Sequence, residues 1–316
     1  MPSINFDESK DAEAIAIIKG GDYNNEILYL HKDDEKPQKK IYKEISAIKY
    51  SKDLKNLKPN ERVMAINKIQ EAYHKNIPLD MFQGNSQIKD LYQKVKDEEK
   101  KDKSIIIPDD SIFNILPSPD EKKRSVYYIA GASGSGKSYM ARGLAEAYKK
   151  MFPNREIYLV SKLDKDSTLD NMKIGKPKRL DVEALVDEYP ALDDFKDTMI
   201  IFDDYDTFEG KTGKIVQQLI DDLAIQGRHS NTTILCLTHY ITNYKKTRLI
   251  LNEATHFIVY PQATSFSALK YLLGTHIGLD KEEIQKLKKL GRWVCISKNY
   301  PQYMISQHMA KLLHQD

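Results

Sequence analysis

Cysteine is scarce in this chain of 316 residues, which holds only Cys236 and Cys295. Both lie in apolar, strand-like segments, a setting that favours buried reduced thiols over a disulfide and indicates a reducing compartment. Long hydrophobic runs are missing too, because no apolar segment approaches the ~18 residues that span a bilayer. The first ten residues are polar and acidic, unlike a secretory signal. A large charge excess is also missing: the net charge is only +3, so bulk charge gives no argument for nucleic-acid binding.

Two patterns in the first hundred residues predict a small accessory unit. Apolar residues 14–19 and 26–31 flank a turn-rich centre, which is typical of a β-hairpin. Helical spacing follows over residues 60–75, with Val63, Ile66, Ile69 and Tyr73 on the expected inner face, and over residues 86–99. We therefore predict an α+β N-terminal domain over residues 1–104 and a second domain over residues 105–316.

Beyond residue 104, short apolar segments alternate with helical patterns. The apolar segments are rich in β-branched residues and nearly free of polar ones, as strands buried on both faces are. This alternation predicts an α/β fold, a mostly parallel sheet with helices on both faces. The expected strands are 105–107, 126–130, 156–160, 199–202, 233–237, 256–260, 293–296 and 303–305, and the expected helices are 139–151, 181–187, 212–227, 266–273 and 280–290.

A glycine-rich loop follows the expected strand 126–130 and matches the phosphate-binding pattern G-x-x-x-x-G-K-S. Its glycines let backbone N–H groups turn toward phosphate oxygens, and the next helix adds its positive N-terminal end. Lys137 is expected to reach the β- and γ-phosphates, and the Ser138 hydroxyl to hold Mg²⁺. The predicted nucleotide-binding residues are Gly131, Ala132, Ser133, Gly134, Ser135, Gly136, Lys137, Ser138 and Tyr139. The chain is therefore expected to bind a nucleoside triphosphate with Mg²⁺.

Two carboxylates end the apolar segment 199–202. Ligands in doubly wound sheets bind at the carboxyl ends of the strands, so Asp203 and Asp204 are expected near the phosphate loop. We assign Asp203 to Mg²⁺, directly or through water, and Asp204 to orienting and deprotonating the attacking water. Asp206 is a weaker candidate, because it lies in the following loop.

A second polar group precedes and ends the expected strand 233–237. Arg228 follows an amphipathic helix, where it either completes the active site of a neighbouring subunit or interacts with its own helix dipole. Thr238 and His239 either bind the γ-phosphate or the attacking water, or form a satisfied polar pair at the strand end. The role of these two as a sensor requires their strand to lie beside the one that ends at Asp203.

Together these segments resemble the genome-packaging ATPases of large double-stranded DNA viruses of eukaryotes, the poxvirus-type branch of the FtsK–HerA superfamily. The resemblance covers roughly residues 105–310. It is carried by GASGSGKS, IIFDD, GRHSNTTILCLTH, NYKKTRLILNEATHFIVYP and GRWVCISKNYPQYMI, in this order.

The resemblance implies a RecA/FtsK-like P-loop ATPase that uses ATP and Mg²⁺ to drive duplex DNA into a capsid. It implies a homo-oligomeric ring of five or six subunits with hydrolysis at their interfaces, and capsid or inner-membrane virion components as partners. It also implies a location in the host cytoplasm, at the viral factory, or in the virion. On this resemblance Arg228 is the finger supplied to the next subunit, and Thr238 with His239 is the sensor. Two departures are evident, since Asp204 stands where the superfamily often has Glu and His239 where it commonly has Gln.

Two basic segments are expected to be loops that grip DNA phosphates without reading sequence. Lysines on surface loops are otherwise simply solvated. The predicted contacts are Lys211, Lys214, Lys245, Lys246 and Arg248, of which Arg248 is also a candidate second finger. Arg292 and Trp293 are expected to be structural.

Two other functions share the phosphate loop. A small-molecule or nucleoside kinase would add an Arg-rich lid and a substrate pocket. A nucleotide-gated assembly factor would bind ATP with negligible turnover, so that Asp204→Asn would leave its function intact.

Overall fold

The computed structural model describes residues 2–32, 36–48, 54, 57–75, 77–101, 103–242 and 244–313, with the backbone alone for 36–39, 98–101, 244 and 245. The first third holds β1 (Ser3–Asn5), β2 (Ala12–Lys19), β3 (Ile27–His31), α1 (Lys36–Ala47), α2 (Pro59–His74) and α3 (Ser86–Lys101). The strands that follow are β4 (Ser104–Ile106), β5 (Ile112–Ile115), β6 (Val126–Ala130), β7 (Ile157–Ser161), β8 (Lys178–Arg179), β9 (Met199–Asp203), β10 (Thr233–Thr238), β11 (His256–Val259), β12 (Val294–Ser297), β13 (Tyr303–Ser306) and β14 (Met309–Leu312). The helices among them are α4 (Lys137–Met151), α5 (Val182–Asp187), α6 (Gly210–Gln226), α7 (Tyr244–Glu253), α8 (Phe266–His276) and α9 (Lys281–Leu287), with short 3₁₀ turns η3 (Leu192–Phe195), η4 (Tyr205–Thr207) and η5 (Pro261–Ala263).

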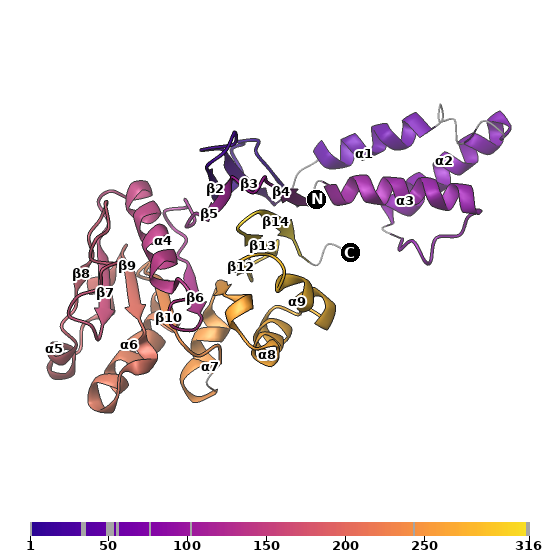
Figure 1. Ribbon diagram of the computed structural model, residues 1–316. Helices are drawn as coiled ribbons and strands as arrows, with labels where there is room; N and C mark the ends of the chain where they lie inside the picture. Colours follow the sequence, from indigo (N-terminus) through magenta and orange to yellow (C-terminus); the bar gives the residue numbers. More distant parts are fainter. Residues whose placement is uncertain are drawn as a thin grey trace.

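A large mixed sheet organises the molecule, in the order β4-β14-β13-β12-β11-β6-β10-β9-β7-β8 (Figure 1). The strands from β11 to β8 run parallel, and β12, β13, β14 and β4 extend the sheet in antiparallel pairs. The predicted α/β fold with a mostly parallel sheet is confirmed for the central strands. Their continuous apolar sequences follow from burial on both faces, because successive side chains of a strand point to opposite sides.

Two cores cover the two faces of this sheet. On β6, Tyr127 packs into the core that contains α4, and its neighbour Tyr128 packs into the core beneath α6, α7, α8 and α9. Figure 1 shows α4 on one face and α6 on the other. The expected helices on both faces are therefore present. Among the helices in the described ranges, none is long and apolar enough to cross a bilayer.

The N-terminal third contributes a second sheet and a separate helical group. The expected hairpin is formed by β2 and β3, and β5 joins it in a four-stranded sheet of order β1-β3-β2-β5. Because β5 lies beyond residue 104, this sheet spans the boundary that we predicted there. The helices α1, α2 and α3 enclose their own apolar core and stand apart from the main body in Figure 1. In α2 the inner face differs from the expectation: Val63 is 45% exposed, whereas Ala65, Ile69, Ala72 and Tyr73 are buried.

Both basic segments that we expected to be loops are helical instead. Residues 210–214 form the first turn of α6, and residues 244–248 form the first turn of α7. In the first of them, Gly210 takes a left-handed φ of 61° at the start of the helix. The N–H of Gly213 donates to the carbonyl of Glu209, which closes the first turn. Burial of the following apolar face, Val216, Leu219 and Leu223, outweighs the low helix propensity of glycine.

Candidate functional site

The phosphate loop lies between β6 and α4, at the carboxyl edge of the parallel strands. Gly134 and Gly136 have φ values of 73° and 109°, which non-glycine residues rarely adopt. A Cβ at Gly131 would come within 2.6 Å of the Tyr260 ring, so the loop also needs glycine there for space. The N–H of Gly131 donates to the Thr238 carbonyl at the end of β10, which joins the loop to the neighbouring strand. Of the predicted nucleotide-binding residues, Ala132, Ser133, Gly134 and Tyr139 are exposed and Gly131, Ser135 and Lys137 are buried, while Gly136 and Ser138 are half-buried.

Lys137 and Asp204 lie close together, as expected if the acids that end β9 lie near the phosphate loop. The Lys137 side chain is 6% exposed, and its Nζ donates to the Gly131 carbonyl at 3.1 Å. The same Nζ lies 3.5 Å from Oδ1 of Asp204. Asp204 follows β9 with a left-handed φ of 43°, which turns its side chain from the strand toward the loop. A cation at the start of α4 and an anion just after β9 therefore face one another where a triphosphate would enter.

Asp203 is a buried carboxylate that fits a bound cation. One oxygen accepts a hydrogen bond from the Ser161 hydroxyl at 3.1 Å, and the other has no hydrogen-bond partner among the described residues. Burial, and then the negative charge of Asp204, raise the pKa of Asp203 to about 6. A divalent cation at the free oxygen would offset both effects, so the donor set suits Mg²⁺, which prefers carboxylate and hydroxyl oxygens. Ser161 ends β7 directly beside Asp203, and the carboxyl-end rule that located the acids also points to it.

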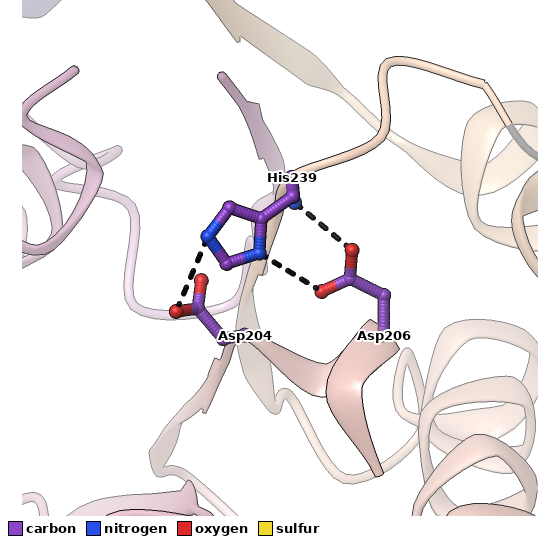
Figure 2. Close-up of side chains that lie close together, drawn as sticks. All are labelled: Asp204, Asp206 and His239. Atoms are coloured by element: carbon purple, nitrogen blue, oxygen red, sulfur yellow. Dashed lines mark hydrogen bonds and ion pairs between the residues drawn. The ribbon is translucent and has the colours of Figure 1, made fainter. Parts of the chain in front are cut away.

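His239 is held between two carboxylates (Figure 2). Its Nε2 lies 3.6 Å from Asp204 and its Nδ1 lies 3.6 Å from Asp206. The backbone N–H of His239 also donates to Asp206 at 3.1 Å. The Asp206 side chain is only 4% exposed, so it is fixed in the protein and not a solvated loop residue. Asp206 thus lies closer to Asp204 and His239 than its position in the sequence suggested, because η4 turns it back toward the end of β10.

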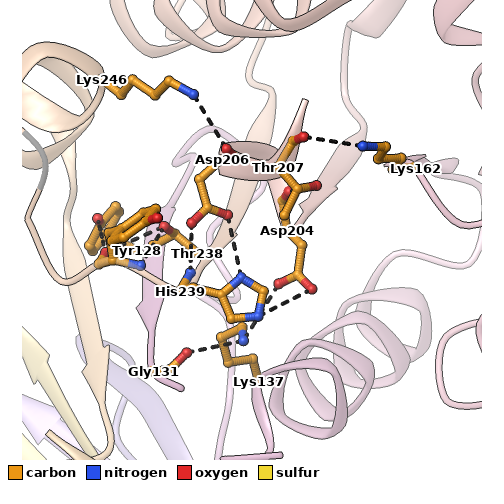
Figure 3. A network of polar contacts seen from close by, with 11 residues as sticks. Tyr128, Gly131, Lys137, Lys162, Asp204, Asp206, Thr207, Thr238, His239 and Lys246 are labelled. Carbon is orange, nitrogen blue, oxygen red and sulfur yellow. Dashed lines mark hydrogen bonds and ion pairs between the residues drawn. The ribbon is translucent and has the colours of Figure 1, made fainter. Parts of the chain in front are cut away.

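Strand β10 lies between β6 and β9, which is the arrangement that a sensor role for Thr238 and His239 requires. Thr238 is fully buried, and its hydroxyl accepts a hydrogen bond from the N–H of Tyr240 at 3.2 Å. The Tyr128 hydroxyl donates to the Tyr240 carbonyl and fixes the same turn (Figure 3). His239 is therefore the side chain at this strand end that faces the acids, and Thr238 shapes the turn beneath it.

Arg228 lies at the opposite edge of the sheet from the phosphate loop. It follows α6 in the connection that leads into the start of β10, whereas Lys137 lies beyond the end of β6. Nearby, the Arg124 guanidinium donates to the last carbonyls of α6, and the positive charge of Arg228 helps lower the pKa of Arg124, after burial. Arg228 is exposed. Within one chain it therefore cannot reach the phosphate site.

The basic residues predicted to contact DNA lie at the starts of α6 and α7. Lys211, Lys214, Lys246 and Arg248 are exposed, and the Lys245 side chain lies outside the described ones. Lys246 donates to the Asp206 carbonyl at 3.3 Å, next to the site (Figure 3).

A groove of about 640 Å³ brings Lys214 and Lys246 together. Three carboxylates, Glu209, Asp221 and Asp222, share this groove, so its charge is mixed. The groove alone is thus a poor match for a phosphate backbone.

Comparison with known proteins gives one close sequence relative. The uncharacterized protein V3 of Sputnik virophage is 32% identical over 223 residues, which cover 69% of this chain and 89% of that protein. No protein-family model matches.

Among solved structures, the genome packaging NTPase B204 from Sulfolobus turreted icosahedral virus 2 is similar at 16% identity and a TM-score of 0.41, covering 61% of this chain and 98% of that one. The cytoplasmic domain of the Type VII secretion ATPase EccC from Thermomonospora curvata is similar at 15% identity and a TM-score of 0.44, covering 65% and 28%. The virophage relative, not these distant similarities, decides the family. The chain belongs to the family of the virophage protein.

Proposed function

We propose that this protein is a Mg²⁺-dependent ATPase that translocates duplex DNA and packages a viral genome. The observation that carries the proposal is the convergence of Lys137 on Asp204, 3.5 Å apart, at the mouth of a glycine loop. A structural salt bridge needs neither the positive φ values of Gly134 and Gly136 nor a second buried carboxylate, Asp203, with one oxygen that lacks a hydrogen-bond partner among the described residues.

Each residue has a defined task in this proposal. Lys137 leaves Asp204 to bind the β- and γ-phosphates, and the loop N–H groups bind the remaining oxygens. Ser138 and Asp203 hold Mg²⁺, which would neutralise phosphate charge during transfer. Asp204, freed from Lys137, orients the attacking water and accepts its proton, and His239 is positioned to follow the change at Asp204 because it contacts the same carboxylate.

Hydrolysis in this proposal takes place between subunits of a homo-oligomeric ring of five or six. Arg228 lies at the edge remote from its own phosphate loop, so it can serve only the site of a neighbour. Its guanidinium would stabilise the charge that develops on the transferred phosphoryl group. Arg248, at the start of α7, is the second candidate for this role.

DNA is proposed to contact exposed cations through its backbone, without sequence readout. Lys211, Lys214, Lys246 and Arg248 carry this part, with Lys245 beside them in the sequence. Capsid or inner-membrane virion components are the proposed docking partners, with the viral factory in the host cytoplasm or the virion as the location. The division into an accessory unit over residues 1–104 and an ATPase unit over residues 105–316 stays part of this proposal.

Hydrolysis measured with and without long duplex DNA, with particle mass measured in parallel, tests the proposal. We expect Mg²⁺-dependent turnover that rises with DNA and requires assembly. Lys137→Ala should abolish nucleotide binding, whereas Asp204→Asn should keep binding and stop turnover. DNA-independent transfer to a small acceptor would instead identify a kinase, and full function of the Asp204→Asn variant would identify a nucleotide-gated assembly factor.

A further inference from the structure

Arg292 binds the outside of the phosphate loop. Its Nε donates to the Ser135 carbonyl at 2.9 Å and its Nη2 donates to the Gly134 carbonyl at 3.1 Å. Arg292 lies two residues before β12, at the antiparallel end of the sheet, and 157 residues from Ser135 in the sequence. One planar guanidinium therefore ties two successive carbonyls of the loop to a distant part of the fold.

The C-terminal strands fix the position of Arg292. Its backbone N–H donates to the side-chain oxygen of Gln307, between β13 and β14, at 2.6 Å. The preceding Gly291 has a φ of 104°, and a Cβ there would come within 2.7 Å of the same Gln307 oxygen. The glycine turn at 291 and the hydrogen bond to Gln307 therefore hold the backbone of Arg292 in one orientation.

Tyr260 completes the support behind the loop. A Cβ at Gly136 would lie 3.5 Å from Nη2 of Arg292 and 3.6 Å from the Tyr260 ring, so both side chains stand directly behind this glycine. Tyr260 is itself buried and follows β11. The loop is thus backed on one side by two residues from the region around β11 and β12.

The geometry of the peptide group gives these contacts a consequence for phosphate binding. A trans peptide places its N–H opposite its C=O. Because Arg292 binds the Ser135 carbonyl, the N–H of Gly136 in the same peptide group points to the other side of the loop. Because Arg292 also binds the Gly134 carbonyl, it orients the peptide group that contains the Ser135 N–H. This N–H donates to the Ala132 carbonyl at 3.1 Å. Hydrogen bonding at a carbonyl also polarises the amide and strengthens its N–H as a donor.

We propose that Arg292 is a positioning residue that preforms the phosphate loop for the triphosphate. This inference rests on the nucleotide binding proposed above, and it assigns to the antiparallel end of the sheet a role in ATP affinity. Without Arg292 the loop would have to become ordered when the nucleotide binds, and the entropy lost in this step would lower the nucleotide affinity.

Equilibrium binding of a fluorescent ATP analogue with Mg²⁺, in the absence of DNA, tests the inference with the variants Arg292→Ala and Arg292→Lys. Arg124→Ala is the matched control, because Arg124 also donates to two successive carbonyls, those of Leu223 and Ala224, at the far edge of the sheet. We expect Arg292→Ala to weaken binding about tenfold or more, the loss expected when charge-assisted hydrogen bonds disappear. Arg292→Lys should bind with intermediate affinity, because an ammonium lacks the planar fork.

Free guanidinium at low concentration should partly restore binding to Arg292→Ala and leave Arg124→Ala unchanged. A merely structural role would give equal effects in the Arg292 and Arg124 variants, matched to their losses in melting temperature, and no rescue. Affinity within twofold of the wild type in Arg292→Ala would also overturn the inference. Failure of the wild type to bind any nucleotide would instead refute the proposed function.

Discussion

Asp203→Asn is expected to make the nucleotide-free protein more stable at neutral pH while removing the proposed Mg²⁺ site. The reason is the cost of a buried charge: the Asp203 side chain is 3% exposed, and one of its oxygens has no hydrogen-bond partner within the described part of the chain. An asparagine keeps the size of the side chain and an oxygen that can accept from Ser161. It leaves one polar atom unpartnered, as the carboxylate does, so that contribution nearly cancels between the two forms.

The sign and magnitude follow from the pKa. Burial and the charge of Asp204 raise the pKa of Asp203 from its ordinary value of 3.8 to about 6. The folded state therefore favours the protonated acid, and the stability that this contributes is present below pH 3.8 and is lost as the pH rises through about 6. The resulting cost of ionisation grows from about 0.5 kcal/mol at pH 4 to about 1.5 kcal/mol at pH 5 and about 3 kcal/mol at pH 7. For a chain of this length, about 3 kcal/mol corresponds to about 4 °C in melting temperature.

Thermal unfolding of the wild type and of Asp203→Asn at several pH values measures this directly. At pH 7 the variant should melt about 4 °C higher without ligand, and the difference should shrink toward pH 4. Addition of ATP and Mg²⁺ should raise the melting temperature of the wild type and barely change that of the variant. Two results would refute this reasoning: a variant that melts below the wild type at pH 7, or a difference in melting temperature that does not depend on pH. Either would show that ionised Asp203 does not destabilise the nucleotide-free protein.

Further variants separate the roles of the remaining residues. Asp206→Asn should keep ATP affinity but lower turnover about tenfold or more, because His239 loses a charged partner that orients it; single-turnover kinetics beside a binding titration distinguishes the two effects. Arg228→Ala subunits should regain turnover in mixtures with Asp204→Asn subunits, since each supplies what the other lacks. Hydrolysis that stays at the level of the separate variants at every mixing ratio would contradict the trans role. Lys211→Gln should leave basal turnover intact and reduce both DNA stimulation and the salt dependence of DNA binding, followed by anisotropy at several salt concentrations. Ser161→Ala should weaken Mg²⁺ activation, seen as a higher Mg²⁺ concentration for half-maximal hydrolysis, because Asp203 loses its hydrogen bond.

The central site was predictable because its residues obey local rules. Glycines with a following Lys-Ser specify a phosphate loop by backbone conformation, and an apolar strand that ends in acids brings them to the carboxyl edge of the sheet. Both rules act within a few residues, so the loop and the position of Asp204 follow from short segments. The same rule also locates Ser161. It was overlooked because a serine at a strand end is common, and only its hydrogen bond to Asp203 identifies it as part of the site.

What escaped prediction depends on contacts between distant segments. The first turn of α6 contains two glycines, and there the expected basic loop 210–214 overlapped the expected helix 212–227; the buried face from Val216 onward makes the whole turn helical. Asp206 was underrated because its burial depends on η4 folding back against the end of β10. Arg292 was expected to be structural, since nothing in its own neighbourhood indicates that Gly134 and Ser135, more than 150 residues earlier, accept its hydrogen bonds.

The placement of Arg228 and Lys137 at opposite edges of one sheet has a consequence for how the proposed motor would avoid idle turnover. Each chain carries the phosphate loop, the proposed cation ligands and the proposed water-orienting acid at one edge, and the proposed finger Arg228 at the other. Only a head-to-tail contact, which repeats around a ring, unites the two edges of different subunits. On this arrangement a free subunit binds ATP but lacks the charge that stabilises the transition state, so binding precedes assembly and hydrolysis follows it. Nucleotide affinity would then be set within one chain, by Lys137 and by the support from Arg292, and the hydrolysis rate would be set at the interface between two.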